Sequence, residues 1–388
     1  MFTVEQLRQL ANFHSNRYSL ATFYWKAPPA ANRSHRGEET LVQDLFREVR
    51  QKLESENHGR EWWNSFEADQ ERILQYLRGA KEGTAANVAV FSCAGESFCQ
   101  ILQLPRGLHS GFVIGENFYL QPLSILLDQY HRSCTVLVDR ASARIFEIYM
   151  GEIEEHTAVL DEVPGKVKAA TWRGGNERQI ERRVENKAHQ HYKRVAEVVL
   201  GFFKKYHFDW LILGGHGDGL KEVESYLHSY LRSRLIGTFA ADVKVASLPE
   251  IMNKSTELIE KHDGQEKRAL VQDVLNKASR NGMAVVGLAD TLRVLSSGQV
   301  HTLVLEEDLR VSAARCRNCG AVTATGAGRC PECNGSLEQI EDVVEQAVQA
   351  AIQDNSQIRF VSGSDELRQA GGIGALLRFR TPETAVEL

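Results

Sequence analysis

The segment ERQIERRVENKAHQHYKRVAEVVLGFFKKYHFDWLILGG, residues 177–215, decides the fold class of this chain. Its first part predicts one long helix that ends near Tyr206, because apolar residues recur along one face at helical spacing. The residues of that face are Ile180, Val184, Ala188, Val195, Val198, Val199 and Phe202. The run DWLILGG that follows is almost uniformly apolar, which is typical of a strand buried on both faces of a parallel sheet. A long helix followed by a buried strand predicts an α/β layer.

The neighbouring segments extend this layer in both directions. Before it, TVLVDRASARIFEIYMGEI (135–153) predicts a hairpin that turns at 139–142. After it, we expect a helix from about Leu220, a strand at VKVASL (243–248) and a linking helix through VQDVLNKASRNG. Together these elements predict a middle domain at 132–278.

Two further α/β segments flank the middle domain. Residues 1–131 predict a strand SLATFYW, two helices, and paired strands NVAVFSC and FCQILQLP around the turn AGES. The first of these helices should place one set of apolar residues on one face: Leu41, Val42, Leu45, Phe46, Val49 and Leu53. Residues 279–388 predict a helix between short strands in MAVVGLADTLRVLSSGQVHTLVLEED, then helix IEDVVEQAVQAAIQ, strand QIRFVS, helix SDELRQA and strand GGIGALLRFR. The predicted fold class is therefore α/β with three domains, at 1–131, 132–278 and 279–388.

Composition and charge exclude several classes of protein. With 43% hydrophobic and 25% charged residues, the chain has the composition of an ordinary soluble globular protein. The net charge of -5 excludes a uniformly basic nucleic-acid-binding protein but allows a local basic face. No apolar run approaches the roughly 18 residues that a membrane span needs. We therefore expect a cytoplasmic protein without a membrane partner.

Four of the seven cysteines form two C-x-x-C pairs, in CRNCG and CPECNG. They are Cys316, Cys319, Cys330 and Cys333. Two such pairs can complete a tetrahedral thiolate shell for Zn²⁺, and a closed shell of four sulfurs leaves no position for a catalytic water. Gly320 and Gly335 lie where such tight turns need a permissive backbone. The pattern predicts a structural zinc in an inserted zinc-ribbon mini-domain at about 312–337, in a reducing compartment.

A second chemical signal is the stretch DEVPGKVKAATWRGGNERQIERR, residues 161–183. Gly174 and Gly175 lack a Cβ, so their backbone can approach a partner closely. Basic residues surround the pair: Lys166, Lys168, Arg173, Arg178, Arg182, Arg183 and Lys187. These side chains could contact RNA phosphates while the glycine amides enter a polar site, or they could form a solvated basic surface. The residues alone favour the solvated surface and leave the alternative open.

Two further patterns near this helix have simple interpretations. GGHGDG (214–219) follows a strand and precedes a helix, but it lacks the lysine of a phosphate-binding loop, so we expect a plain turn. His189 and His191 stand two residues apart and point apart on a helix, which argues against a metal pair. We expect both histidines to face RNA or solvent.

Carboxylates and tryptophans elsewhere give weaker signals. Asp139 and Asp218 are too sparse for the acidic cluster of a two-metal nuclease. Trp62 and Trp63 could stack on bases, but packing between helices is the simpler interpretation. Neither pair by itself predicts a site.

The motif RGGN followed by ERQIERRVENKAHQHYKRVAEVV, then DWLILGG and a C-terminal GGIGALLRFR, resembles the archaeo-eukaryotic class I release factor and Pelota superfamily. More closely, the chain is similar to the bacterial, Balon-like branch of that superfamily. The resemblance covers the middle and last domains well, and the first domain only in the order of its elements. It implies a ribonuclease-H-like middle domain and a C-terminal α/β/α sandwich.

In that family a Gly-Gly-Gln loop enters the peptidyl transferase centre and promotes hydrolysis of peptidyl-tRNA. By position, Gly174 and Gly175 match the glycines and Asn176 stands in place of the glutamine. The resemblance implies that the backbone N–H of the third loop residue donates to the developing oxyanion, and asparagine preserves that donor. The shorter side chain would position water less well. The resemblance also implies that the C-terminal domain contacts a translational GTPase such as elongation factor Tu.

Three functions are compatible with this resemblance. The first is a rescue factor that occupies the ribosomal A site and releases the nascent chain without reading a stop codon, since the first domain has no Asn-Ile-Lys-Ser motif. The second is a non-enzymatic hibernation or recycling factor, which the missing glutamine favours. The third, a nuclease acting on tRNA ends, has the least support.

Overall fold

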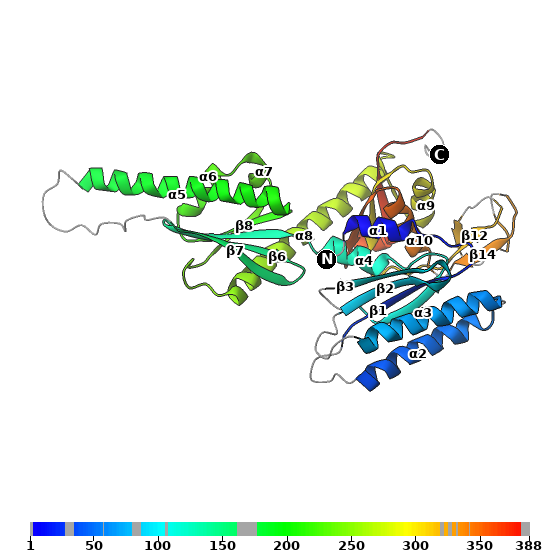
Figure 1. The fold of residues 1–388 in the computed structure, drawn as a ribbon. Coiled ribbons are helices and arrows are strands. Elements are labelled where there is room, and N and C mark those ends of the chain that lie inside the picture. The colour runs from blue at the N-terminus through cyan, green and yellow to red at the C-terminus, as the bar shows by residue number, and fades with distance from the viewer. Residues whose placement is uncertain are drawn as a thin grey trace. The chain divides into compact units, whose positions relative to one another are not determined.

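The computed structural model describes residues 3–27, 35–56, 58–79, 87–104, 108–160, 177–318, 322–324, 328–330, 333–340 and 342–381 (Figure 1). The chain divides into two compact units. Unit 1 consists of residues 1–129 and 267–388, and unit 2 consists of residues 130–266. Among the described residues, no helix combines the length and the apolar character needed to cross a bilayer.

The first sheet of unit 1 is antiparallel, with the strand order β3-β2-β1-β4. Its strands are β1 (Leu20–Trp25), β2 (Asn87–Cys93), β3 (Phe98–Leu104) and β4 (Gly111–Gly115). The helices α2 (His35–Leu53) and α3 (Arg60–Gly79) lie together on one face of this sheet (Figure 1). The predicted strands and helices of this segment, including the β2–β3 hairpin, are confirmed.

The apolar faces of α2 and α3 meet the sheet in a core that includes Phe23, Phe46 and Phe66. Five of the six apolar residues predicted for the inner face of α2 pack there. The exception is Leu41, which is 57% exposed although its neighbour Val42 is fully buried. One residue corresponds to about 100° of helix rotation. The prediction for Leu41 is therefore wrong because the residue falls beyond the edge of the contact face.

The second sheet of unit 1 has the order β10-β16-β11-β15, in which β11 pairs parallel with β15 and antiparallel with β16. Its strands are β10 (Ala284–Val286), β11 (Val300–Glu306), β15 (Gln357–Val361) and β16 (Ile373–Leu377). The helices of this segment are α9 (Leu288–Ser296), α10 (Val343–Gln353) and α11 (Asp365–Gln369). The predicted alternation is confirmed. Two helices that the sequence did not predict, α1 (Val4–Ala11) and α4 (Gln121–Gln129), contact α10.

Buried polar contacts join the first and last segments of the chain within unit 1. On α4, Asp128 Oδ1 lies 2.8 Å from Arg359 Nε of β15. On α10, the Glu345 carboxylate accepts the backbone N–H groups of Leu120 and Gln121 at 2.8 and 2.9 Å. Residues of the predicted first and third domains thus share one compact unit. The division into three domains stays a prediction.

Unit 2 is built on a mixed sheet with the order β7-β6-β5-β8-β9. Its strands are β5 (Ser133–Val138), β6 (Ser142–Tyr149), β7 (Glu152–Leu160), β8 (Trp210–Gly215) and β9 (Leu235–Ala240). Strands β5 to β7 are antiparallel neighbours, whereas β8 is parallel to both β5 and β9. Its helices are α5 (Glu177–Tyr206), α6 (Gly219–Tyr226), α7 (Ser229–Arg232) and the first part of α8 (Leu248–Ser279).

The sheet of unit 2 is covered on both faces, which explains the uniformly apolar sequence of β8. Leu211 and Leu213 belong to the core beneath α5, α6 and α7. Leu137 and Phe146 pack with Ile251 of α8 on the opposite face. The predicted hairpin, long helix and buried strand are confirmed.

Two elements of unit 2 differ from the prediction. Residues 243–248 form no strand, because the Asp242 side chain accepts the Lys244 N–H at 2.9 Å and Ala246 N–H bonds to the Asp242 carbonyl at 2.9 Å, which turns the chain. The strand at this point is the preceding one, β9. Strand β7 was not predicted, since it opens with the charged sequence EIEE, as edge strands often do.

The predicted cysteine-rich insertion contains a small antiparallel sheet with the order β13-β12-β14. Its strands are β12 (Ala313–Cys316), β13 (Val322–Ala324) and β14 (Leu337–Ile340). The sheet extends slightly past the predicted end of the mini-domain at 337.

Candidate functional site

The glycine pair lies in the connection between β7 and α5. Strand β7 ends at Leu160 and α5 begins at Glu177. The predicted residues between them lie outside the described residues: Lys166, Lys168, Arg173, Gly174, Gly175 and Asn176. The structure therefore describes the two elements that bracket this loop. Figure 1 shows the N-terminal turns of α5 extending beyond the end of the sheet.

Helix α5 follows the loop directly in the sequence, and the N-terminus of the helix carries a positive partial charge. Its 30 residues span about 45 Å at the usual rise of an α-helix. The first N–H groups of a helix have no partner within it, and the helix dipole makes this end positive. Asn176 directly precedes the helix in the sequence, so the loop ends at a helix terminus that favours anions.

The predicted basic residues continue along the exposed side of α5. Arg182, Arg183 and Lys187 are exposed, and Arg178 lies in the first turn with a side chain outside the described residues. Over residues 182–206, α5 carries seven Lys and Arg residues and two Glu residues. The opposite face is buried in the core of unit 2 through Val184, Ala188, Val195 and Val199. The helix therefore separates an apolar face from a strongly basic one.

The two histidines of α5 have different environments. His189 is exposed, and its Nδ1 lies 3.1 Å from Glu222 Oε2 on α6. His191 is 1% exposed, so the expectation that it faces RNA or solvent is wrong. The reason is helical spacing: His191 follows Val184 by two turns and shares its buried face.

The GGHGDG sequence packs as the predicted strand-to-helix turn. A Cβ at Gly215 would lie 2.4 Å from the Val138 carbonyl oxygen, and one at Gly219 would lie 2.7 Å from Tyr192 Oη. These glycines allow close packing. The Asp139 carboxylate accepts the N–H groups of Ala141 and Ser142 at 2.8 and 2.7 Å, so it stabilises the β5–β6 turn.

Three of the four predicted metal ligands gather in the mini-domain. The Sγ atoms of Cys316, Cys330 and Cys333 all lie within 4.8 Å of one another, and Cys319 lies outside the described residues. Asn318 N–H donates to Cys316 Sγ at 3.4 Å, and the Asn318 side chain donates to Cys333 Sγ at 3.5 Å. Hydrogen-bond donors beside metal-binding side chains hold those side chains in orientation.

Gly335 makes room for the sulfur atoms. A Cβ on this residue would lie 2.9 Å from Cys316 Sγ and 3.2 Å from Cys333 Sγ. Three convergent sulfurs, with a fourth cysteine close in the sequence, fit the donor set of a structural zinc site. The three described cysteines can therefore serve as ligands of a metal ion.

Unit 1 contains a recess that the sequence did not predict. It has a volume of about 1000 Å³, and its lining includes Arg17, Lys52, His58 and Trp62. The His58 and Trp62 rings are stacked, with centroids 3.8 Å apart. Trp62 and Trp63 also pack against the sheet core, which confirms the packing interpretation. The four-residue spacing of His58 and Trp62 could have indicated the stack.

Unit 2 holds an ionic network that the sequence also did not reveal. Glu147 lies on β6, and its Oε1 is 2.6 Å from Arg132 Nη1. Its Oε2 is 2.7 Å from His156 Nε2. Burial, and to a lesser degree the charge of Glu147, raise the pKa of the Cys134 thiol. Arg132 and His156 thus each contact one of the two carboxylate oxygens of Glu147.

The sequence matches two family models. Residues 119–282 match the model described as Bacterial archaeo-eukaryotic release factor family 10. Residues 265–381 match the model eRF1 domain 3. Similar proteins include the peptide chain release factor subunit 1 of Thermococcus sibiricus, which is 29% identical over 350 residues, covering 80% of this chain and 83% of the relative. The corresponding subunit of Pyrococcus abyssi is 28% identical over 297 residues, covering 68% and 70%.

Two solved structures also match this chain over most of its length. A translation termination-like factor of S. cerevisiae, involved in RNA quality control, is 11% identical, with a TM-score of 0.45 and coverage of 78% of this chain and 81% of that one. Pelota of Archaeoglobus fulgidus is 13% identical, with a TM-score of 0.32 and coverage of 77% and 81%.

Proposed function

Since the chain belongs to the archaeo-eukaryotic release factor and Pelota superfamily, in its bacterial branch, we propose that it rescues stalled ribosomes from the A site. In this role it releases the nascent chain by hydrolysis of peptidyl-tRNA and reads no stop codon. The observation that carries the proposal is the basic helix α5, whose N-terminus directly follows the Gly-Gly-Asn sequence. The order of the unit 2 sheet, with three antiparallel strands followed by two parallel ones, supports a ribonuclease-H-like middle domain.

The proposed chemistry uses the backbone of the loop. Water attacks the ester carbon that joins the peptide to the tRNA, and negative charge develops on the carbonyl oxygen. The Asn176 N–H stabilises that oxyanion, while Gly174 and Gly175 allow the backbone to approach the ester. The ester C–O bond then breaks, and the tRNA ribose oxygen leaves with a proton. Arg182, Arg183 and Lys187 bind RNA phosphates and fix the loop in place.

Single-turnover release of a peptide from peptidyl-tRNA on purified ribosomes tests this proposal. We expect release by the wild type and a loss of roughly 100-fold or more in Gly175→Ala, because a Cβ would obstruct the donor. Asn176→Gln keeps the backbone donor and should retain or increase activity. Gly201→Ala is the matched control, since Gly201 lies on α5 with open space around it. Absence of release at saturating protein would remove the hydrolytic role.

A second candidate is a non-enzymatic hibernation or recycling factor that docks in the A site with a translational GTPase such as elongation factor Tu. The observation that favours it is Asn176 in the position of the family's glutamine. Its signature is co-sedimentation with ribosomes at moderate salt without any peptide release. If the wild type does not co-sediment, both ribosomal roles fail.

A tRNA nuclease is less favoured, because the Asp139 carboxylate is engaged in the β5–β6 turn. If tRNA stays intact after incubation with the protein and stalled ribosomes, the nuclease role is excluded.

The cysteine cluster is proposed to bind one structural Zn²⁺ through Cys316, Cys319, Cys330 and Cys333. The three converging sulfurs and the close approach at Gly335 support this assignment. We expect one equivalent of zinc in the purified protein and a lower Tm after treatment with a chelator. Clearly less than one equivalent, together with freely reactive thiols, would exclude the site.

A further inference from the structure

Two tyrosines are exposed on unit 2 where α6 is joined to α7. Tyr226 ends α6 and is 40% exposed, and Tyr230 in α7 is 64% exposed. The core of unit 2 takes Val223, Leu227 and Leu231 from the same segment. The tyrosines therefore present their rings to the surface while their neighbours hold the segment in place.

Neighbouring residues bind the backbone of Tyr230, and one of them, His228, stacks on its ring. The His228 ring lies parallel to it, with centroids 5.3 Å apart and an interplanar angle of 3°. His228 Nδ1 accepts the Tyr230 N–H at 3.3 Å, and Arg234 Nη1 donates to the Tyr230 carbonyl at 2.9 Å. Arg232 Nη2 donates to the Ser225 carbonyl at 3.0 Å and so ties α7 to the end of α6. A ring fixed in this way loses little conformational entropy when a flat partner stacks on it.

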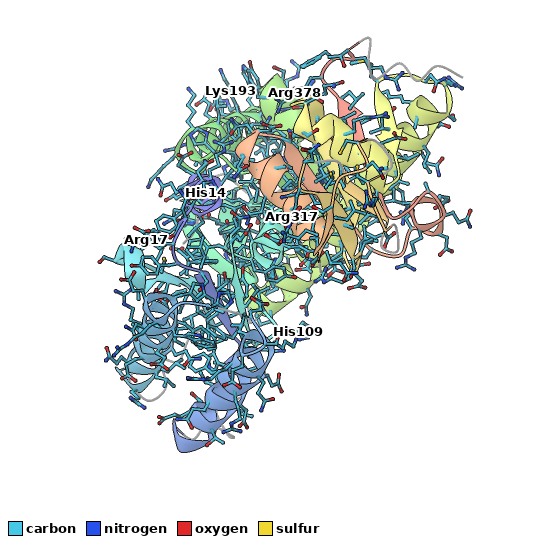
Figure 2. All side chains as sticks on the ribbon, turned by 90° about the vertical axis from the view of Figure 1, so that its right-hand side faces the viewer. His14, Arg17, His109, Lys193, Arg317 and Arg378 are labelled. Atoms are coloured by element: carbon cyan, nitrogen blue, oxygen red, sulfur yellow. The ribbon has the colours of Figure 1, made fainter. Side chains whose placement is uncertain are left out.

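Tyr226 adjoins the exposed side of α5. His189 Nδ1 lies 3.3 Å from Tyr226 Oη, which places α5 directly beside the end of α6. Lys193 follows His189 by one helical turn, and its side chain projects from the ribbon (Figure 2). The whole chain has a net charge of -5, whereas residues 182–206 carry seven basic and two acidic residues. Positive charge is thus concentrated along α5, the helix that lies beside Tyr226, while Glu222 of α6 contacts His189 at the junction.

We propose that Tyr226, Tyr230 and the adjoining side of α5 form a contact surface for single-stranded RNA. An unpaired base stacks on Tyr230, and the phosphates follow Lys193 and the other exposed cations of α5. Exposed rings beside a basic track suit a single strand, because a duplex hides the faces of its bases. The inference rests on the proposed function, since ribosomal RNA supplies such strands, and it adds a contact made by residues other than the glycine loop.

Fluorescence anisotropy of the full chain tests the surface directly. The probes are a labelled oligouridine of about 12 nucleotides and an RNA duplex of the same length. We expect Tyr230→Ala to weaken binding of the single strand by about 5- to 150-fold, and Tyr230→Phe to preserve it because a phenyl ring also stacks. Lys193→Ala should lower the salt dependence of log K by about one unit, whereas Tyr230→Ala should leave that slope unchanged. Phe379→Ala is the matched control, because Phe379 is an exposed aromatic residue (48%) of unit 1.

Ribosome co-sedimentation of the same variants separates this inference from the proposed function. If the wild type binds ribosomes and oligouridine, and Tyr230→Ala binds both equally well, the RNA surface is wrong and the proposed function stands. If only ribosome binding falls in Tyr230→Ala, the tyrosines contact a ribosomal protein and the RNA inference is again wrong. If the wild type binds oligouridine in a Tyr230-dependent manner but not ribosomes, the surface stands and the proposed function fails.

Discussion

At the scale of single residues, Gly335 links backbone shape to metal chemistry. We expect Gly335→Ala to lower the zinc content and the Tm, because the added methyl would lie 2.9 Å from Cys316 Sγ, closer than a Cβ is found to any neighbour. Overpacking of this kind costs about 1–3 kcal/mol. Metal analysis and thermal unfolding check the prediction. Gly328→Ala is the control in the same mini-domain, since nothing lies within 4 Å of its added Cβ. Equal zinc content in the two variants would contradict it.

Leu41 and His191 show how far a single residue can be predicted. Both belong to helices that the sequence predicts well. The errors concern burial: Leu41 is exposed by its position at the edge of a face, and His191 is buried by its two-turn distance from Val184. Periodicity places a residue on a face, but the partner element decides how wide the covered part of that face is.

At the scale of elements, the exposed side of α5 should act as an electrostatic contact. We expect Lys187→Ala to reduce the slope of log K against log salt for ribosome binding by about one unit, because one phosphate contact is lost. Co-sedimentation at a series of salt concentrations measures the slope. Lys244→Ala is the control, since Lys244 is an exposed lysine of unit 2 outside α5. Equal slopes in the two variants would mean that Lys187 meets no phosphate.

The contact of α10 with the start of α4 should make the stability of unit 1 depend on pH. Burial raises the pKa of Glu345 to about 8, although the N–H groups of Leu120 and Gln121 oppose the shift. Because the pKa is higher in the folded state than in the unfolded state, protonation of Glu345 contributes to the stability of the fold. This contribution is fully present below about pH 4.5 and is lost as the pH rises through about 8. The loss is at most about 1.4 kcal/mol per pH unit.

Glu345→Gln should remove this dependence. We expect the free energy of unfolding of the wild type, minus that of Glu345→Gln, to fall as pH rises from about 5 to 8 and to level off above. The variant also carries a constant loss, because its amide accepts only one of the two N–H groups. Urea unfolding at each pH measures the difference, and Glu48→Gln, at an exposed position on α2, serves as control. A difference that does not vary with pH would contradict the prediction.

At the scale of the whole molecule, unit 1 should unfold as one cooperative body although its two segments are far apart in the sequence. Asp128 is nearly buried and lies 3.4 Å from Lys267 Nζ and 2.8 Å from Arg359 Nε. Asp128→Asn should destabilise unit 1 by about 3 kcal/mol, because two cations lose their shared partner.

Hydrogen exchange measures whether both segments respond. We expect peptides from β2 and from β11 to lose protection together in Asp128→Asn, since both strands belong to unit 1. Asp44→Asn is the control: it removes an exposed ion pair with Arg47 and should change stability by less than about 1 kcal/mol. Loss of protection in β11 alone would show that the two segments unfold separately.

Most elements could be predicted, because their signals are local. Helical spacing marked α5, and an apolar run between polar segments marked β8. The segment 243–248 was mispredicted because Asp242 closes a turn that hydrophobic alternation does not reveal. Of the candidate site, the sequence identified the residue types, and the structure describes α5 and three of the four cysteines.

The sequence by itself determined most of the strands and helices, the paired cysteines and the glycine pair next to a basic helix. These features depend on residue type and spacing, which are properties of neighbours in the chain. Only the tertiary structure decided that Asp128 meets Arg359 and that Tyr226 lies beside His189. Such contacts join residues that are distant in sequence, and they form because burial of apolar faces brings separate elements together, which no local pattern encodes.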